Sequence, residues 1–246
     1  STINMAEKNV VTTPTPETNE ALDKAKGFWA NYSKPITYIG GAVIVLILGW
    51  YAYLNFVKLP NEKKANESVF AAEKVFDKMA SDNFSKDSVN IVLNGGNLGG
   101  TTITGLLKVI SNYSGTKAAN RARYMTGACY LHIKEYDKAI KYLKEFDGNG
   151  ADQVQSKANI MIGHAYAEQK KTEDALTYYK KAATVNEKDE SITPDALMLA
   201  ASYADFTGKS KDAIELYKKV KDKFPTYMAV SNGDVDKQLA RLGVFN

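Results

Sequence analysis

Three stretches in the second half of the chain repeat one pattern and decide the fold. They are RYMTGACYLHIKEYDKAIKYLKEFDG at residues 123–148, NIMIGHAYAEQKKTEDALTYYKKAAT at residues 159–184, and LMLAASYADFTGKSKDAIELYKKVKDKFP at residues 197–225. When Ala139, Ala175 and Ala213 are aligned, the spacing is 36 and then 38 residues. A period of this length is typical of repeat proteins whose units stack on their neighbours.

Each unit is predicted to form two helices joined by a short polar turn, which reads EYDK, KTED or KSKD. The alanine after each turn is small, so the second helix can approach the first closely. A large side chain follows four residues later, one helical turn along the same face, and fills the space between the helices. These large residues are Leu143, Tyr179 and Tyr217.

The three units resemble tetratricopeptide repeats. Gly127 and Tyr130 on the first predicted helix recur as Gly163 and Tyr166, and Pro225 closes the third unit. The pattern is incomplete: the third unit has alanines in the Gly and Tyr places, and the first two lack the closing proline. The resemblance implies an all-α fold, a right-handed solenoid of about three helix pairs whose concave groove is lined mainly by the first helix of each pair.

The same resemblance assigns residues to a groove that binds a peptide or a partner helix. They are Tyr124, Ala128, His132, Ile160, His164, Met198 and Ser202. Some chaperone-docking repeats grip a terminal carboxylate with a lysine and asparagine clamp, and here Tyr124 and Ala128 occupy its first two places. We therefore do not expect an adaptor for C-terminal carboxylates.

A second strong signal is the uncharged stretch PITYIGGAVIVLILGWYAYLNFV, which begins at Pro35 and Ile36 and runs through Trp50 to Val57. As a helix it would be about 35 Å long, enough to cross a hydrocarbon core of about 30 Å. Aromatic residues gather at both ends, as they do at membrane interfaces. The stretch is predicted to be an uncleaved transmembrane helix; a buried core helix and a cleaved secretory signal are the alternatives, and both are usually shorter.

The flanking charges do not settle the orientation of this span. Lys24, Lys26 and Lys34 precede it, and Lys58, Lys63 and Lys64 follow it, so the positive-inside count is a tie. A short N-terminal tail and a large C-terminal region favour a cytoplasmic N-terminus and a periplasmic C-terminal domain at the inner membrane.

Four segments are predicted from these patterns. They are a polar cytoplasmic tail at 1–34, the span at 35–57, a helical spacer with a Gly-rich loop and a degenerate first repeat at 58–115, and the repeat domain with a C-terminal capping helix at 116–246. Within the tail, residues 1–27 are polar and are predicted to be disordered apart from a short amphipathic helix near 17–32.

Composition argues against catalysis and against nucleic-acid binding. Among 246 residues, Lys and Arg exceed Asp and Glu by only four, and only three residues are arginines, so no nucleic-acid partner is expected. One cysteine and two histidines leave little from which to build a disulfide, a metal site or an acid–base pair. We expect no catalytic residue, no metal and no cofactor, and we expect Cys129 to be a buried, inert thiol.

Two shorter motifs resemble a phosphate-binding loop and a glycosylation site. Gly95 and Gly100 have the spacing of a phosphate-binding loop, but Thr101 stands where the lysine would be, so a flexible loop between helices is predicted instead. Asp87-Ser88-Val89 resembles the O-glycan acceptor sequence of exported proteins of Bacteroidota, which marks Ser88 as a candidate for modification.

Taken together, a short tail, one span, a helical spacer and a tetratricopeptide domain resemble the YfgM-like family of ancillary Sec translocon subunits, in particular its Bacteroidota members. The resemblance implies a non-enzymatic protein whose span lies beside the Sec channel subunits. Its periplasmic repeats would dock a periplasmic foldase of the PpiD type and meet nascent or unfolded exported polypeptides. A tetratricopeptide scaffold for envelope or outer-membrane protein assembly is the alternative, and the sequence barely separates the two.

Overall fold

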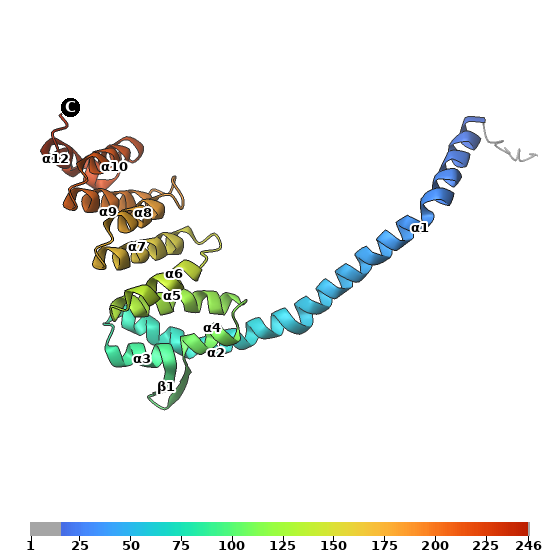
Figure 1. The fold of residues 1–246 in the computed structure, drawn as a ribbon, viewed down its shortest axis with the longest axis horizontal. Helices are drawn as coiled ribbons and strands as arrows, with labels where there is room; N and C mark the ends of the chain where they lie inside the picture. The colour runs from blue at the N-terminus through green and yellow to red at the C-terminus, as the bar shows by residue number, and fades with distance from the viewer. Residues whose placement is uncertain (1–15, 246) are drawn as a thin grey trace, which may run out of the picture. The chain divides into compact units, whose positions relative to one another are not determined.

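The computed structural model describes residues 16–245, which fall into two compact units that meet at Leu59 and Pro60. The first unit is α1 (Pro16–Tyr53) followed by one stretch of π-helix, η1 (Leu54–Lys58). The second unit contains every other element (Figure 1). Each unit is described by itself.

Two prolines shape the helix of the first unit. Pro35 lies inside α1 and has no N–H to donate to the carbonyl of Asn31, and Figure 1 shows α1 bending in its N-terminal part. At the other end, Leu59 N–H donates to the carbonyl of Leu54, five residues back instead of four. This wider turn comes immediately before Pro60, where a regular helix would press the proline ring against the preceding turn.

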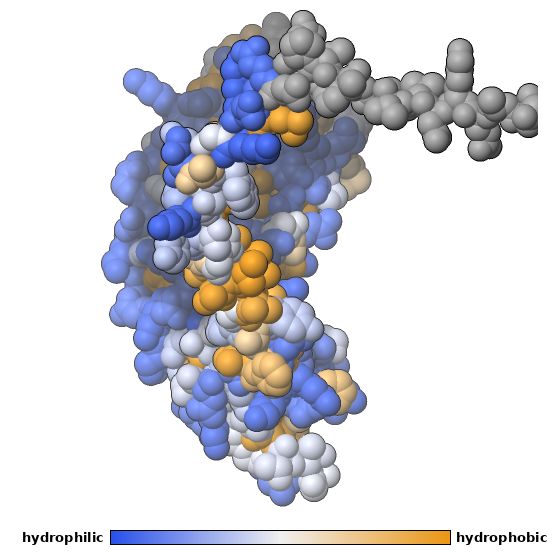
Figure 2. All heavy atoms as spheres, turned by 90° about the vertical axis from the view of Figure 1, so that its right-hand side faces the viewer, coloured by the Kyte–Doolittle hydropathy of each residue, from blue (hydrophilic) through white to orange (hydrophobic). Residues whose placement is uncertain are grey.

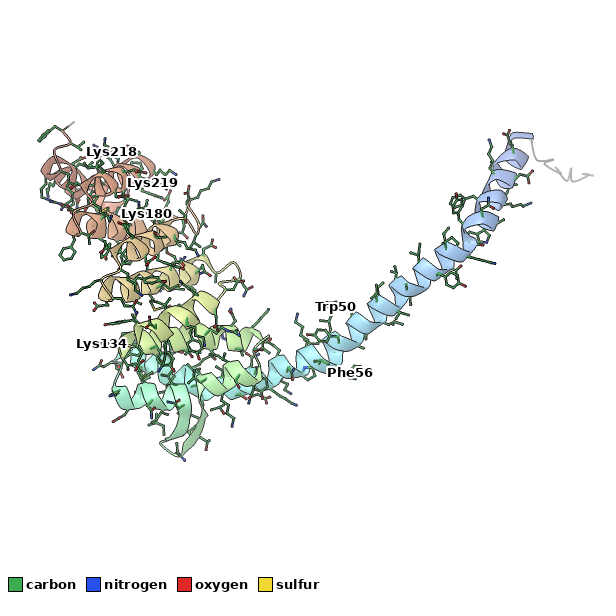
Figure 3. The ribbon with its side chains drawn as sticks, in the orientation of Figure 1. Trp50, Phe56, Lys134, Lys180, Lys218 and Lys219 are labelled. Atoms are coloured by element: carbon green, nitrogen blue, oxygen red, sulfur yellow. The ribbon has the colours of Figure 1, made fainter. Side chains whose placement is uncertain are left out.

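The apolar side chains of α1 are exposed. The most hydrophobic window of this helix has a mean hydropathy of 1.8 and no buried residue, and it is long and apolar enough to cross a membrane. Figure 2 shows exposed hydrophobic residues gathered in a band between hydrophilic surfaces, and Figure 3 shows Trp50 and Phe56 projecting away from the helix.

Residues 1–15 of the tail predicted to be disordered lie outside the described residues. Residues 17–27 belong to the short helix predicted near 17–32, and the structure has them in α1, which begins at Pro16. Once the apolar stretch forms a helix, each further residue adds a hydrogen bond without a new nucleation cost, and the tail is rich in good helix formers. The helix expected near 17–32 is therefore the first part of α1.

The second unit begins with elements that do not follow the repeat pattern, and six helices in three pairs come next. The first group is α2 (Leu59–Ser81), α3 (Lys86–Asn94), β1 (Gly95–Leu98), β2 (Thr101–Thr104) and α4 (Leu106–Asn112). The pairs are α5 (Lys117–His132) with α6 (Tyr136–Glu145), α7 (Asp152–Glu168) with α8 (Thr172–Ala183), and α9 (Thr193–Phe206) with α10 (Ser210–Lys223). The last elements are α11 (Met228–Ser231) and α12 (Asp234–Arg241). The all-α class and the three helix pairs are confirmed.

Close contact within each pair depends on a small residue in the first helix. A Cβ added at Gly127 would lie 2.4 Å from Leu143 Cγ, and one added at Gly163 would lie 2.5 Å from the Tyr179 ring. Both distances are too short for real atoms. The large side chain of the second helix therefore fits only where the first helix has a glycine at the facing position. The repeat pattern predicted this close approach.

The turn between the two helices of each pair is also repeated. The left-handed residue is Lys134 in the first pair, Lys170 in the second and Gly208 in the third, with φ of 65°, 59° and 76°. In each turn the next N–H donates to a carbonyl five residues back, for example from Glu135 to Tyr130 at 2.9 Å. This is the C-terminal capping geometry that satisfies the last carbonyls of the first helix.

Polar contacts tie each repeat to the next one, and the third repeat to the C-terminal segment that holds α12. Their partners are 32 to 36 residues apart: Tyr136 with Glu168, Lys180 with Asp212, Lys209 with Glu173, Tyr227 with Asp195, and Arg241 with Asp205. These side chains are partly or largely exposed, and pairs of this kind contribute about 0–1 kcal/mol each. The buried apolar side chains between the pairs therefore provide most of the stability, and the polar contacts fix the register.

The Gly-rich segment is not a flexible loop, so that prediction was wrong. Residues Gly95–Leu98 pair antiparallel with Thr101–Thr104, and Gly99 and Gly100 form the two-residue turn with positive φ of 59° and 82°. Two adjacent residues in this conformation suit a tight hairpin turn. At its base, a Cβ on Gly105 would lie 2.4 Å from the Asn94 carbonyl carbon, so the hairpin closes tightly against the end of α3.

The glycine contact in the second pair gives a test of the packing. Gly163→Ala should lower the free energy of unfolding by about 1–3 kcal/mol, because the added methyl forces the Tyr179 ring to move. Gly115→Ala is the matched control: no atom lies within 4 Å of its added Cβ, and the change should stay within about 0.5 kcal/mol. Urea unfolding followed by circular dichroism measures both, and equal midpoints for the two variants would contradict the packing argument.

Candidate protein-binding surface

The first helices of the three pairs, α5, α7 and α9, share one exposed side, which we call the first-helix surface. Three cavities lie along it. One of about 550 Å³ lies between α2 and α5, one of about 460 Å³ lies between α7 and α9, and one of about 390 Å³ lies between α9 and α12. These volumes fall within the range of about 300–1,000 Å³ that is usual for ligand pockets. The surface is thus hollowed at both ends.

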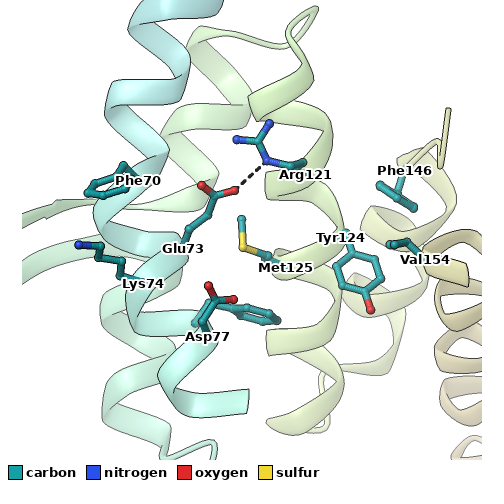
Figure 4. Close-up of a pocket in the computed structure, with 10 residues that line it drawn as sticks. Phe70, Glu73, Lys74, Asp77, Arg121, Tyr124, Met125, Phe146 and Val154 are labelled. Atoms are coloured by element: carbon teal, nitrogen blue, oxygen red, sulfur yellow. Dashed lines mark hydrogen bonds and ion pairs between the residues drawn. The ribbon is translucent and has the colours of Figure 1, made fainter. Parts of the chain in front are cut away.

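The cavity between α2 and α5 exists because α2 is fastened to the first repeat. The Glu62 carboxylate accepts hydrogen bonds from the backbone N–H groups of Lys117 and Ala118 at 2.9 and 3.2 Å, which caps the start of α5. Arg121 Nε donates to the Glu73 carboxylate at 2.8 Å, and its terminal nitrogen donates to Asn66 at 3.0 Å. Figure 4 shows α2 and α5 facing one another across this cavity.

At the other end, Phe206 is the dominant feature of the first-helix surface. Its ring is 88% exposed at the end of α9, and it lines both the cavity next to α7 and the cavity next to α12. Large exposed aromatic side chains are enriched at protein interfaces. Phe206 occupies the same repeat position as His132 and Glu168, which the first and second repeats expose.

The predicted groove residues occupy several different environments. Tyr124 lines the cavity next to α2, His164 the cavity between α7 and α9, and Ser202 the cavity next to α12. Ile160 and Met198 are half-buried and pack against the C-terminal hydrophobic cluster.

Two further groove residues stand apart from these cavities. His132 is exposed but stacks on Phe84 with ring centres 3.7 Å apart, which directs it toward the segment between α2 and α3. Ala128 is only 5% exposed, so it offers almost no surface to a partner.

The second and the third repeat each have a polar contact between their two helices, at corresponding positions. His164 Nδ1 lies 2.8 Å from the Tyr179 hydroxyl, and the Ser202 hydroxyl lies 3.3 Å from that of Tyr217, at the corresponding positions. Burial lowers the pKa of His164 below its usual value of 6.5, and nearby Glu168 opposes that shift. The neutral imidazole is therefore favoured, and burial likewise raises the pKa of Tyr179, so this pair carries no charge near neutral pH.

Three features of the sequence bear on chemistry: the single cysteine, a possible metal site and the candidate glycosylation site at Ser88. Cys129 is fully buried as predicted, and burial raises the pKa of its thiol to about 12, which disfavours the reactive thiolate. Within residues 16–245 no group of three or more His, Cys, Asp or Glu side chains is placed to hold a metal ion. Ser88 lies in the first turn of α3, where its hydroxyl accepts a hydrogen bond from Ser85 at 2.8 Å, and its glycosylation stays a prediction.

Comparison with protein families agrees with the geometry of the helix pairs. Three family models described as tetratricopeptide repeat match residues 108–154, 156–189 and 195–227. These segments are tetratricopeptide repeats. None of the three models describes an enzyme, and repeats of this kind form protein–protein interaction modules.

The comparison with the curated proteins gives no match. Among solved structures, the chain is similar to one titled "Crystal structure of MamA protein". The two are 16% identical with a TM-score of 0.46, over 72% of this chain and 87% of that chain.

Two parts of the binding surface were missed by sequence reasoning. Phe206 was available from the sequence, because aligning the repeats position by position places it level with His132. The wall formed by α2 was not available, because its contacts with α5 join residues 48 to 56 apart that lie outside the repeat pattern.

The lowered pKa of His164 predicts a loss of stability in acid. Below about pH 6.5 the unfolded chain takes up a proton that the folded state resists, so stability is fully present above that pH and falls as the pH drops. The pKa of His132 is lowered by burial too and acts in the same direction. We expect the urea midpoint to fall less between pH 7.5 and 5.5 in His164→Gln than in the wild type. An identical fall in both would contradict the assignment.

Proposed function

We propose that this chain is a membrane-anchored, non-enzymatic interaction module, in which α1 crosses the membrane and the tetratricopeptide repeats bind protein partners. One observation carries the proposal: a helix with a long, uncharged and fully exposed apolar stretch belongs to the same chain as three interaction repeats. Exposed apolar surface of this extent is unfavourable in water, and a bilayer would cover it. The aromatic residues around Trp29 and Trp50 would then lie at the two interfaces.

The finer assignment is an ancillary subunit of the Sec translocon. It rests on the resemblance of the whole arrangement to the YfgM-like family. On this proposal the tail before residue 35 is cytoplasmic, and the segments 58–115 and 116–246 are periplasmic. The span lies beside the Sec channel subunits, and the first-helix surface receives a foldase of the PpiD type or an unfolded exported polypeptide.

The first-helix surface fits this role in two respects. The cavity next to α2 and the cavity between α7 and α9 have mainly apolar surfaces, which suit the apolar side chains that unfolded chains expose. Its best-exposed aromatic, Phe206, lies between two cavities and can serve as a contact for a partner without loss of core packing.

Membrane anchoring can be tested by alkaline carbonate extraction. The wild type should stay in the membrane pellet, whereas Ile44→Arg combined with Leu46→Arg should move to the supernatant, because each arginine costs about 2.5–3.5 kcal/mol at the centre of a span. Phe206→Arg, which changes an exposed apolar residue outside α1, is the control and should stay in the pellet. Release of the wild type would contradict the proposed span.

The partners can be tested by capture from native membranes in a mild detergent, with a tag at the C-terminus and identification by mass spectrometry. Sec channel subunits and a foldase should co-purify with the wild type. Capture should fall at least about tenfold with Phe206→Ser, because truncating an aromatic hot-spot residue of an interface costs about 2 kcal/mol or more. Met228→Ser, at a residue that is 76% exposed on α11, should leave capture unchanged.

Two outcomes of this capture would be decisive against parts of the proposal. Envelope-assembly proteins without the Sec channel would overturn the translocon assignment and favour an assembly scaffold. Equal capture by the wild type and Phe206→Ser would move the binding site away from the first-helix surface.

A further inference from the structure

The largest cavity on the first-helix surface has a floor that the repeat pattern does not provide. It has a volume of about 550 Å³ and is lined by residues of α2, of α5, and of the segments around α6 and α7. The apolar members are Phe70, Phe76, Tyr124, Met125, Phe146 and Val154. Phe76 and Met125 are buried in the core that joins α2 to α5, so the floor is rigid.

The charged residues of this cavity are not all paired with one another. The Glu73 carboxylate is occupied by Arg121 at 2.8 Å, and the Lys74 ammonium lies 4.5 Å from the centre of the Phe70 ring. Asp77 is exposed and makes no hydrogen bond or ion pair with any residue of the described range 16–245. Figure 4 shows Asp77 on the side of α2 that faces α5, beside the apolar floor. The four charges sum to zero, with Glu73 and Asp77 against Lys74 and Arg121, and Asp77 is the carboxylate left free to accept a cation of a partner.

We propose that this cavity binds one large apolar side chain of a partner polypeptide that carries a lysine or arginine beside it. The apolar side chain would enter the floor between Phe70 and Met125, and the cation would pair with Asp77. The inference rests on the proposed function, since it names the kind of segment that the repeats accept.

The position of the cavity favours a polypeptide segment as its occupant. Phe146 directly follows α6, Val154 lies in the first turn of α7 and Tyr124 belongs to α5, so the cavity opens next to the first-helix surface. A segment that lies along that surface would pass over it. One side chain could then enter while its neighbours contact the remaining repeats.

The test uses the full chain in nanodiscs of phosphatidylcholine, which has no net charge. Three fluorescein-labelled peptides of twelve residues share a Gly-Ser background and carry Phe-Arg, Phe-Glu or Ala-Arg at the centre. Fluorescence anisotropy, corrected for binding to empty nanodiscs, should show that the Phe-Arg peptide binds at least about tenfold more tightly than either other peptide.

Substitutions of residues that line the cavity test whether the preference for the Phe-Arg peptide arises there. Asp77→Lys should reverse the order of the Phe-Arg and Phe-Glu peptides, and Phe70→Ala should weaken the binding of both. Glu67→Lys makes the same charge change at an exposed carboxylate of α2 outside the cavity and should leave the order unchanged. Both positions 77 and 70 are exposed, and circular dichroism melts confirm that each variant is folded.

Several results would overturn the inference. These are equal binding of the three peptides, a Phe-Arg preference that survives in Asp77→Lys, and binding no greater than that to empty nanodiscs. If the peptides fail while capture of partners from membranes still depends on Phe206, only this inference falls. If both fail, the proposed function falls as well.

Discussion

The array depends on how closely the two helices of each pair approach one another. At Gly127 and Gly163 no room remains for a single methyl group, because Leu143 and Tyr179 of the second helix already fill it. This close contact sets the distance and angle within a pair, and the pair then presents a fixed surface to the next one. A single helix pair cannot bury its apolar face, so each repeat needs its neighbours in order to stay folded.

The start of the array is stabilised by a helix that is not part of the repeat pattern. Along α2, Glu62 caps the N-terminus of α5 and Glu73 pairs with Arg121, while Val69 and Phe76 enter the same core as Met125. Solenoids need such end structures, because the first repeat would otherwise expose the face that a preceding repeat covers. At the other end α12 has this role, with Leu239 buried against the C-terminal core. In the repeat domain predicted at 116–246, α12 (Asp234–Arg241) lies where the sequence predicted a C-terminal capping helix.

The sequence was sufficient where the cause of the structure is local and periodic. The spacing of Ala139, Ala175 and Ala213, together with the turn residues before them, specified the helix pairs. It was insufficient where the cause is a contact between distant residues, as between Glu73 and Arg121. It was also insufficient where a glycine permits several backbone conformations, because the sequence does not show which one is adopted. The hairpin at 95–104 is an example. From the sequence its glycines predicted a flexible loop, but in the fold Gly99 and Gly100 form a tight turn and the next residue, Gly105, allows close packing against α3.

The restriction of contacts to neighbouring repeats has a mechanical consequence. The polar ties from Tyr136 to Glu168 and from Lys180 to Asp212 each cross one boundary, and none spans two repeats. When a load is applied along the stack, every boundary carries the same force, and the weakest one yields first without releasing the others. The array would therefore lengthen in steps of one helix pair and recoil when the load is removed, so that it behaves as an elastic element and not as a rigid rod.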